Sequence, residues 1–210
     1  DIRVKTNCGV GIESIYSETS FLTICLPITT IPFLETFEAN SPTLNCWSAI
    51  NNNEDDITWN IYTGAGYEHS GTQFAGIYTD GNAGYNDDYL ISPNIVLTGN
   101  EFLSFFHRAR SSSEPNDFEV LLSTTGTEPA DFTTVLLTDT SVLTTYSLVN
   151  LDLTAYTGNV YIAFHIPSGG LDGWYLFIDD VSISTCPLLS NVAVSSITPN
   201  SATVSWIPGG

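Results

Sequence analysis

Hydrophobic and polar positions alternate in short runs along this chain, and Gly, Asn, Asp and Pro separate the runs. Alternation with a period of two places successive side chains on opposite faces of a β-strand, whereas an amphipathic helix needs a period near 3.6. Helical periodicity is scarce. Strand-like runs recur throughout: IRVKT, SFLTI, FLSFF, FEVLLS, YSLVNLDL, VYIAFHI, WYLFIDDVSI, NVAVSSI and ATVSW. The pattern predicts an all-β chain.

The strand-like run GWYLFIDDVSI, residues 173–183, carries two adjacent carboxylates. On a regular strand Asp179 and Asp180 face opposite ways, so one of them points into the core whichever face is buried. A buried carboxylate without a partner is strongly destabilising. We therefore expect a metal ion, or hydrogen bonds from backbone and hydroxyl groups near the end of the strand.

Acidic residues dominate the charge of the chain. The 210 residues include 23 Asp and Glu but only 4 Lys and Arg, for a formal net charge of −19. Most carboxylates must therefore be hydrated or bound to metal ions. Nucleic acid and anionic membranes are excluded as partners, because both need a basic surface. Membrane insertion is not expected either, since no apolar run approaches 18 residues. The hydrophobic content of 42% suffices for a packed core rather than a disordered chain.

Two Cys-Pro stretches, at residues 25–32 and 186–189, divide the chain into three zones. The expected domain ranges are 1–27, 28–185 and 186–210. The first zone resembles the last two strands of a fibronectin type III domain of bacterial surface proteins. The last zone resembles the first two strands of such a domain, with Trp206 in its core. A sandwich of that class needs about 100 residues, so the chain is either a fragment or one frame of a longer tandem array.

The central zone carries a series of motifs in a recognisable order. They are Phe37-Glu38, Cys46-Trp47, residues 87–93, residues 123–126 with Asp131-Phe132, and residues 178–181. This series resembles the cleaved-adhesin modules of gingipain-type surface proteins, which are similar to MAM domains. The resemblance implies a non-catalytic, antiparallel jelly-roll sandwich of two sheets. The loop at 51–56 departs from the family pattern, because NNNEDD replaces a DxDGDG-like run, which weakens the case for a calcium site built from that loop.

The same resemblance implies a structural calcium ion where the first and last strands of the jelly roll meet. Calcium takes six to eight oxygen ligands at about 2.3–2.6 Å, from carboxylates and backbone carbonyls. The motif positions nominate Glu38 and Asp180 as the leading ligands, with Asp56 and Asp87 as weaker candidates. The alternative is that the carboxylates at 179 and 180 only accept hydrogen bonds.

The four cysteines, Cys8, Cys25, Cys46 and Cys186, lie too far apart for a CxxC metal site and indicate disulfides in a secreted protein. If all four are bonded within the chain, three pairings are open. The resemblance to MAM domains implies a Cys25–Cys46 bridge, with Cys8 and Cys186 pairing inside their own incomplete domains. The alternative pairing joins Cys8 to Cys25.

Catalytic motifs are missing from the sequence: there is no HExxH, no GxSxG, no P-loop and no GxGxxG that opens a helix. His107 and His165 lie inside apolar strands and are expected to be packed, and His69 lies in a loop. Aromatic residues near loops are the better candidates, because exposed rings can stack on sugars. These are Trp59, Tyr62, Tyr67, Tyr85 and Trp174. The alternative is that their rings pack in the core or on the sheets.

The sequence is compatible with three function classes. The leading one is a calcium-stabilised adhesion or spacer module of a large multidomain protein, secreted or on the bacterial cell surface. Its partners would be neighbouring domains, tandem copies, and a glycan or host surface protein. The second is a carbohydrate-binding accessory module of a secreted hydrolase. The third is an ancillary domain of a secreted protease.

Overall fold

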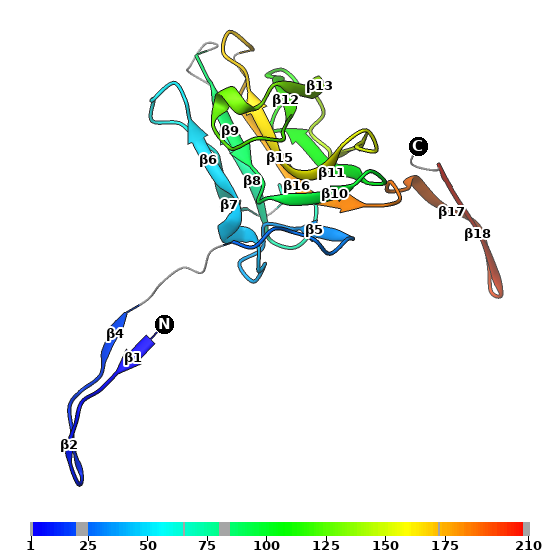
Figure 1. Cartoon of the computed structure of the whole chain (residues 1–210). Coiled ribbons are helices and arrows are strands. Elements are labelled where there is room, and N and C mark those ends of the chain that lie inside the picture. The colour runs from blue at the N-terminus through cyan, green and yellow to red at the C-terminus, as the bar shows by residue number, and fades with distance from the viewer. Residues whose placement is uncertain (1, 20–24, 65, 80–84, 172, 208–210) are drawn as a thin grey trace.

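The computed structural model describes residues 2–19, 25–64, 66–79, 85–171 and 173–207 (Figure 1). One sheet of its central body consists of β6 (Ser48–Asn51), β9 (Asp88–Ile91), β10 (Ile95–Thr98), β12 (Asn116–Ser123), β13 (Thr134–Ser141) and β15 (Thr157–Ile166). The other consists of β5 (Phe33–Glu35), β7 (Asn60–Thr63), β8 (Gln73–Tyr78), β11 (Phe102–Ala109), β14 (Ser147–Asp152) and β16 (Tyr175–Ser184).

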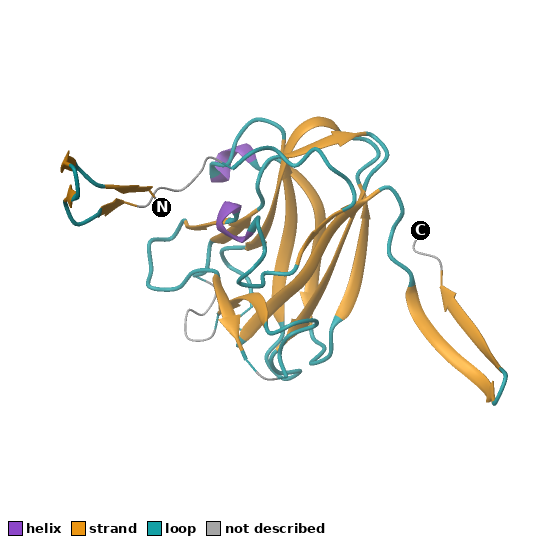
Figure 2. Ribbon diagram, turned by 90° about the horizontal axis from the view of Figure 1, so that it is seen from below, coloured by secondary structure: helices purple, strands orange, loops and turns teal. Residues whose placement is uncertain are grey.

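Both sheets are antiparallel and have six strands. The first has the order β13-β12-β15-β9-β6, with β10 also paired to β15. The second has the order β14-β11-β16-β8-β7, with β5 also paired to β16. Two short 3-10 helices, Leu44–Cys46 and Pro129–Asp131, complete the regular structure of the described residues (Figure 2). The prediction of an all-β antiparallel sandwich is confirmed, and in the described part of the chain no helix has the length and apolar character needed to cross a membrane.

Alternating side chains from the two sheets fill the space between them. On β11, Leu103 and Phe105 are fully buried in this core, and Val160 and Phe164 on β15 lie opposite in the same cluster. Phe105 and Phe164 meet edge to face, with ring centroids 4.9 Å apart. Burying each such side chain stabilises the fold by about 1.5–3 kcal/mol, so the alternation in the sequence accounts for the core.

A β-bulge at Asp180 interrupts the alternation of β16. Ser104 on β11 pairs with Ser182, but Phe106 pairs with Asp179, so β16 has one extra residue in this interval. Asp180 has a positive φ of 47°, in the left-handed region that one type of β-bulge uses. The bulge returns Val181 to the core face, and neither carboxylate points into the core. The prediction that one of them must do so assumed a regular strand and is wrong for that reason.

A disulfide joins Cys25, ahead of the first sandwich strand, to Cys46 in the first 3-10 helix. This is the pairing that the family resemblance implied, and it leaves no bond from Cys25 to Cys8. Cys186 is exposed and free rather than paired within the last zone. The side chain of Cys8 lies outside the described residues.

Hairpins at each end of the chain stand apart from the sandwich (Figure 1). At the N-terminal end, β1 (Ile2–Val4) pairs with β4 (Ser17–Thr19), and β2 (Asn7–Gly9) pairs with β3 (Ile12–Glu13). At the C-terminal end, β17 (Ser190–Thr198) pairs with β18 (Ser201–Ile207). Trp206 is 53% exposed instead of lying in a core, because its two-stranded hairpin has no second sheet to pack against. The fibronectin type III assignment of these ends stays a prediction.

Candidate ligand-binding face

Aromatic side chains cover the outer face of the sheet that contains β16, the face turned away from the core. Phe177 packs edge to face against Phe74, at 4.9 Å between centroids, and Tyr62 packs against Tyr175 at 5.9 Å. The loop of residues 64–72, which connects β7 to β8, contacts this layer. Tyr67 from the loop lies 5.4 Å from Phe177. We call this surface, with its covering loop, the outer face.

Asp179 anchors the loop from beneath. Its Oδ2 accepts hydrogen bonds from the backbone N–H groups of His69 at 2.8 Å and Ser70 at 3.2 Å, and its Oδ1 accepts one from Asp180 N–H at 2.8 Å. The side chain is fully buried. Burial raises the pKa of Asp179 to about 6, although the hydrogen bond from His69 N–H acts in the opposite direction. Backbone donors therefore satisfy the carboxylate that the sequence left unexplained.

Glu38 and Asp180 hold two neighbouring points of the same loop. Asp180 Oδ1 accepts from the Ser70 hydroxyl at 2.8 Å, and its Oδ2 lies 2.5 Å from His69 Nδ1. Glu38 Oε1 accepts from the backbone N–H groups of Thr72 and Gln73, at 2.6 and 2.7 Å, which lowers its pKa. The two predicted calcium ligands thus bind one loop two residues apart. The contacts of Asp180 are hydrogen bonds, as in the alternative hypothesis that the carboxylates of this strand hold no metal ion.

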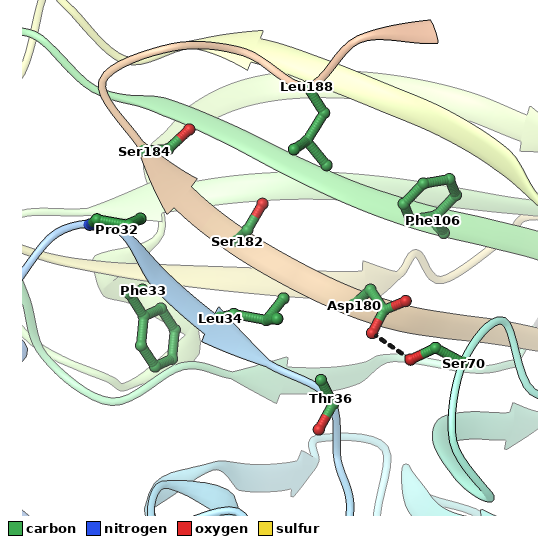
Figure 3. Close-up of a pocket in the computed structure, with 10 residues that line it drawn as sticks. All are labelled: Pro32, Phe33, Leu34, Thr36, Ser70, Phe106, Asp180, Ser182, Ser184 and Leu188. Carbon is green, nitrogen blue, oxygen red and sulfur yellow. Dashed lines mark hydrogen bonds between the residues drawn. The ribbon is translucent and has the colours of Figure 1, made fainter. Parts of the chain in front are cut away.

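Ser70 of the loop also lines a groove of about 510 Å³ on the outer face (Figure 3). Phe33 and Leu34 line it from β5, Phe106 from β11, and Ser70 and Asp180 from the loop and its anchor. Leu188, from the segment after β16, also lines the groove, and its carbonyl accepts a hydrogen bond from Asn150 Nδ2 at 3.2 Å. The segment that leads to the C-terminal hairpin is therefore attached to this face.

Ser70, His69 and Asp180 do not form a catalytic relay. The Ser70 hydroxyl and the His69 ring both bond to the Asp180 carboxylate, so the serine oxygen is not paired with the imidazole as a nucleophile would be. The His69 ring also stacks on Phe106, with centroids 3.6 Å apart. Their arrangement fastens a loop.

Two arginines lie among the aromatic rings of the outer face. The guanidinium carbon of Arg110 is 4.0 Å from the ring centroid of Trp174 and 5.3 Å from that of Tyr67. The guanidinium carbon of Arg108 is 5.2 Å from the Tyr67 centroid and 5.7 Å from that of Tyr146. Such distances are typical of cation–π contacts. We call these five residues the arginine–aromatic cluster.

The structure separates the other predicted sugar-binding residues. Trp59 is only 3% exposed, lies in the core, and donates its indole N–H to the Asp88 carbonyl at 3.3 Å, which removes it from the candidates. Tyr62 is partly buried in the aromatic layer of the outer face. Tyr85 is 74% exposed but lies away from the cluster, beside Asn53, whose side-chain amide donates to its carbonyl. Tyr67 and Trp174 are the two that the structure brings together.

A second acidic site lies where β6 pairs with β9. Asp88 is fully buried, and its Oδ1 has no hydrogen-bond partner. Burial, followed by the negative charge of Asp55, raises the pKa of Asp88 to about 7. Asn53 donates from Nδ2 to Asp55 Oδ2 at 2.8 Å, and its own Oδ1 is buried without a partner. Two buried acceptor oxygens therefore lack donors beside an acidic loop.

The remaining predicted metal ligands do not converge on one point. Asp87 lies between Asn52, whose Nδ2 is 2.6 Å from Oδ2, and His165, whose Nε2 is 2.9 Å from Oδ1. The other ring nitrogen of His165 is 3.1 Å from Glu119 Oε2, so this histidine is packed between two carboxylates. Asp56 is exposed. Within the described residues, no three Asp, Glu, His or Cys side chains are arranged to hold a metal ion by themselves.

Sequence reasoning missed Arg108, Arg110 and Asp88 as site residues. A signal for the arginines was present, because alternation in SFFHRAR places Arg108 and Arg110 on the same face as Phe106. For Asp88 the local sequence gave no comparable signal, since the neighbouring Asp87 has the same side chain and is only partly buried.

The chain was compared with known proteins. The family model described as Cleaved Adhesin Domain matches residues 30–183. Hemagglutinin A of Porphyromonas gingivalis is 30% identical over an alignment of 167 positions, which covers 67% of this chain and 6% of that protein. A second hemagglutinin A, from strain ATCC BAA-308 / W83, is 29% identical over an alignment of 167 positions, which covers 67% of this chain and 8% of that protein. The chain therefore spans less than a tenth of the length of these curated relatives.

Solved structures agree with the family match in fold. The K1 cleaved adhesin domain of Lys-gingipain from Porphyromonas gingivalis W83 has a TM-score of 0.62 at 24% identity, over 74% of this chain and 98% of that one. The K2 domain of Lys-gingipain has a TM-score of 0.60 at 23% identity, over 73% and 99%. With the family model covering most of the sandwich, the chain belongs to the Cleaved Adhesin Domain family.

Proposed function

We propose that this module is a calcium-stabilised adhesion or spacer domain of a large multidomain protein, secreted or displayed on a bacterial surface. Members of its family are non-catalytic adhesion domains of hemagglutinin and gingipain proteins, so the module is not an enzyme. The much greater length of hemagglutinin A supports a setting among neighbouring domains. The segment after β16, attached to the outer face through Leu188, supports contact between the module and the C-terminal part of the chain.

The observation that carries the calcium part is the unpaired Oδ1 of buried Asp88. A carboxylate in that position needs a cation or a proton. The buried Oδ1 of Asn53 is a second oxygen atom without a partner, and oxygen is the donor type that calcium selects. Asp55 contributes negative charge beside Asp88, although its own oxygens accept hydrogen bonds from Asn53 Nδ2 and Ile57 N–H. At Glu38 and Asp180, by contrast, the carboxylate oxygens already accept hydrogen bonds from the loop at 69–73. The unpaired oxygens of Asp88 on β9 and Asn53 in the loop after β6 therefore support calcium here more than at the predicted pair.

A melting experiment tests the calcium site. Calcium at 100 times its dissociation constant should stabilise EDTA-treated protein by about 2.7 kcal/mol. This corresponds to an increase in Tm of roughly 5–10 °C for a domain of this size. Asp88→Asn should remove most of this increase, while Glu38→Gln should retain it. A Tm that calcium leaves unchanged would refute the proposal. An increase lost in Glu38→Gln but kept in Asp88→Asn would move the ion to the predicted pair.

A second candidate function is carbohydrate binding, as an accessory module of a secreted hydrolase. It is favoured by the meeting of Tyr67 and Trp174, which come from two separate loops, on the outer face. Partly exposed aromatic rings stack on the apolar face of sugars. A glycan array with the calcium-loaded module tests this candidate, and an array without binders would remove it while leaving the adhesion proposal to be tested on protein-coated surfaces. An ancillary role beside a secreted protease is the third candidate, which a protease domain in the same polypeptide would support.

A further inference from the structure

The arginine–aromatic cluster concentrates the positive charge of the sandwich at one place. The four basic residues of the chain are Arg3, Lys5, Arg108 and Arg110, so the last two supply all the Lys and Arg of residues 28–185. In a chain of net charge −19, random placement would pair them with carboxylates. In the described structure, however, neither guanidinium lies within 4.0 Å of a carboxylate oxygen. The carboxylate of Glu68, on which the charge of Arg108 acts, instead accepts hydrogen bonds from the Gly66 and Tyr67 N–H groups.

Stacking leaves the donors of Arg110 unused. A guanidinium that stacks on a ring engages its flat face, while its five N–H groups point outward in its own plane. No described residue accepts a hydrogen bond from the Arg110 side chain, and its Nε is buried without a partner. Arg108, by comparison, donates from Nη1 to the Gly66 carbonyl at 3.1 Å, which positions the loop. Arg110 is thus held rigidly by Trp174, Tyr175 and Tyr67 with its fork of donors unpaired.

A ligand that pairs with the Arg110 guanidinium and also packs on the aromatic rings needs a group with two anionic oxygens and an apolar face. A carboxylate matches the guanidinium fork with two parallel hydrogen bonds, and a pyranose ring presents C–H groups to Trp174 and Tyr67, which are partly exposed. We propose that the arginine–aromatic cluster is a binding site for a sugar that carries a carboxylate, such as a uronic or sialic acid. This inference rests on the carbohydrate-binding candidate and gives it a ligand class.

The charge of the chain narrows the ligand further. A net charge of −19 repels polyanions over roughly a Debye length, which is about 8 Å at physiological ionic strength. Two arginines offset one or two ligand charges but not a long run of them. The site therefore suits a single acidic residue within a mainly neutral glycan, rather than a heavily sulfated chain.

Matched sugars test the proposal. Methyl β-D-glucuronide and methyl β-D-glucoside share the same ring and differ at C6, where one has a carboxylate and the other a hydroxymethyl group. We expect NMR titration of the calcium-loaded chain to show binding of the glucuronide at least about tenfold tighter than of the glucoside, with shifts at the Trp174 indole N–H. Glucose 6-sulfate and an acidic peptide serve as probes for general anion binding.

Variants distinguish the bidentate hydrogen bonding of the Arg110 guanidinium from the effect of its positive charge. Arg110→Lys keeps the charge but loses the fork, and should weaken glucuronide binding about tenfold. Arg3→Gln lowers the net charge by one unit away from the cluster and should leave binding unchanged. An equal melting temperature of the variants excludes unfolding as the cause, and Trp174→Phe, which keeps a ring, supplies a second variant should Arg110→Lys unfold.

Three outcomes would overturn the proposal. Equal binding of glucuronide and glucoside would indicate a site for neutral sugars. The carbohydrate-binding candidate would then stand, but the proposal of an acidic sugar would be wrong. Equal binding of glucuronide, glucose 6-sulfate and acidic peptide would leave a general anion site. Absence of binding by all probes would refute the proposal and, together with an empty glycan array, the carbohydrate candidate. The calcium-dependent melting experiment remains independent of all three.

Discussion

Asp179→Asn is the sharpest test of how the outer face is held together. The carboxylate accepts three backbone hydrogen bonds, two on Oδ2 and one on Oδ1. Asparagine keeps one acceptor oxygen, and its NH₂ group faces the remaining donors. Either the Asp180 N–H or both the His69 and Ser70 N–H groups then lose their acceptor. Each unpaired buried donor costs about 1–3 kcal/mol, partly offset by removal of a buried charge, so we expect a loss of about 2 kcal/mol.

Differential scanning calorimetry at pH 7.5 should measure this loss as a decrease in Tm of roughly 4–8 °C, given about 2–4 °C per kcal/mol for domains of 150–250 residues. Asp56→Asn is the matched control, because Asp56 is exposed and makes no hydrogen bond in the described part of the chain, and it should melt like the wild type. If Asp179→Asn melts within about 1 °C of the wild type, the three hydrogen bonds do not hold the loop.

The same variant has a defined pH dependence. Burial raises the pKa of Asp179 from 3.8 to about 6, so the native state binds a proton more tightly than the unfolded state does. The stability that this group contributes is therefore fully present below about pH 4 and is lost as the pH rises through about 6. Asparagine does not titrate. The stability difference between wild type and Asp179→Asn should be larger at pH 4.5 than at pH 7.5, and a difference that grows toward pH 7.5 would contradict this assignment.

Two further predictions concern the attachments of the first strand. Cys25 and Cys46 are bonded across a sequence separation of 21, so replacing both by Ser should lower the free energy of unfolding, measured in urea titrations, by about 3 kcal/mol. Cys186→Ser should leave the free energy of unfolding unchanged, because that thiol is exposed and free. Glu38→Gln should accelerate hydrogen exchange at the Thr72 and Gln73 amides, which donate to Glu38. These bonds lower the pKa of Glu38 below 4.5, so in the wild type the Thr72 and Gln73 amides should lose their protection from exchange only as the pH falls through that lowered pKa. Equal exchange of these amides in wild type and variant at neutral pH would show that Glu38 does not hold the loop.

Local pattern was enough to predict the sheets, but not the path of every strand. Alternation correctly places Leu176 and Ile178 on one face of β16. It fails after Asp179, because the bulge arises from pairing with β11 and from the loop that needs both carboxylates on its own side. Register between distant strands is a property of the assembled sheet, and a single strand sequence carries little information about it.

The candidate site was predictable only in part for the same reason. Tyr67 and Trp174 were identified from their loops, yet Trp59, chosen on the same grounds, packs in the core. The rings differ in whether the rest of the fold covers them, and the sequence of a single loop does not determine this. Arg110 became a candidate only through its three aromatic partners, Tyr67 from one segment of the chain and Trp174 and Tyr175 from another. The proposed calcium site likewise depends on the pairing of Asn51 with Asp88, which brings the loop that carries Asp55 to β9, rather than on a contiguous motif.

The fastening of residues 69–73 has a consequence for how adhesion is acquired and lost. Glu38 holds this segment from near the start of the sandwich, and Asp179 and Asp180 hold it from the last strand. During synthesis the Tyr67 surface therefore remains unformed until the final strand has emerged and paired. A protease that cuts within β16 would disrupt the Tyr67 surface without cutting the loop that forms it. Formation of the Tyr67 surface would thus report that the sandwich is complete.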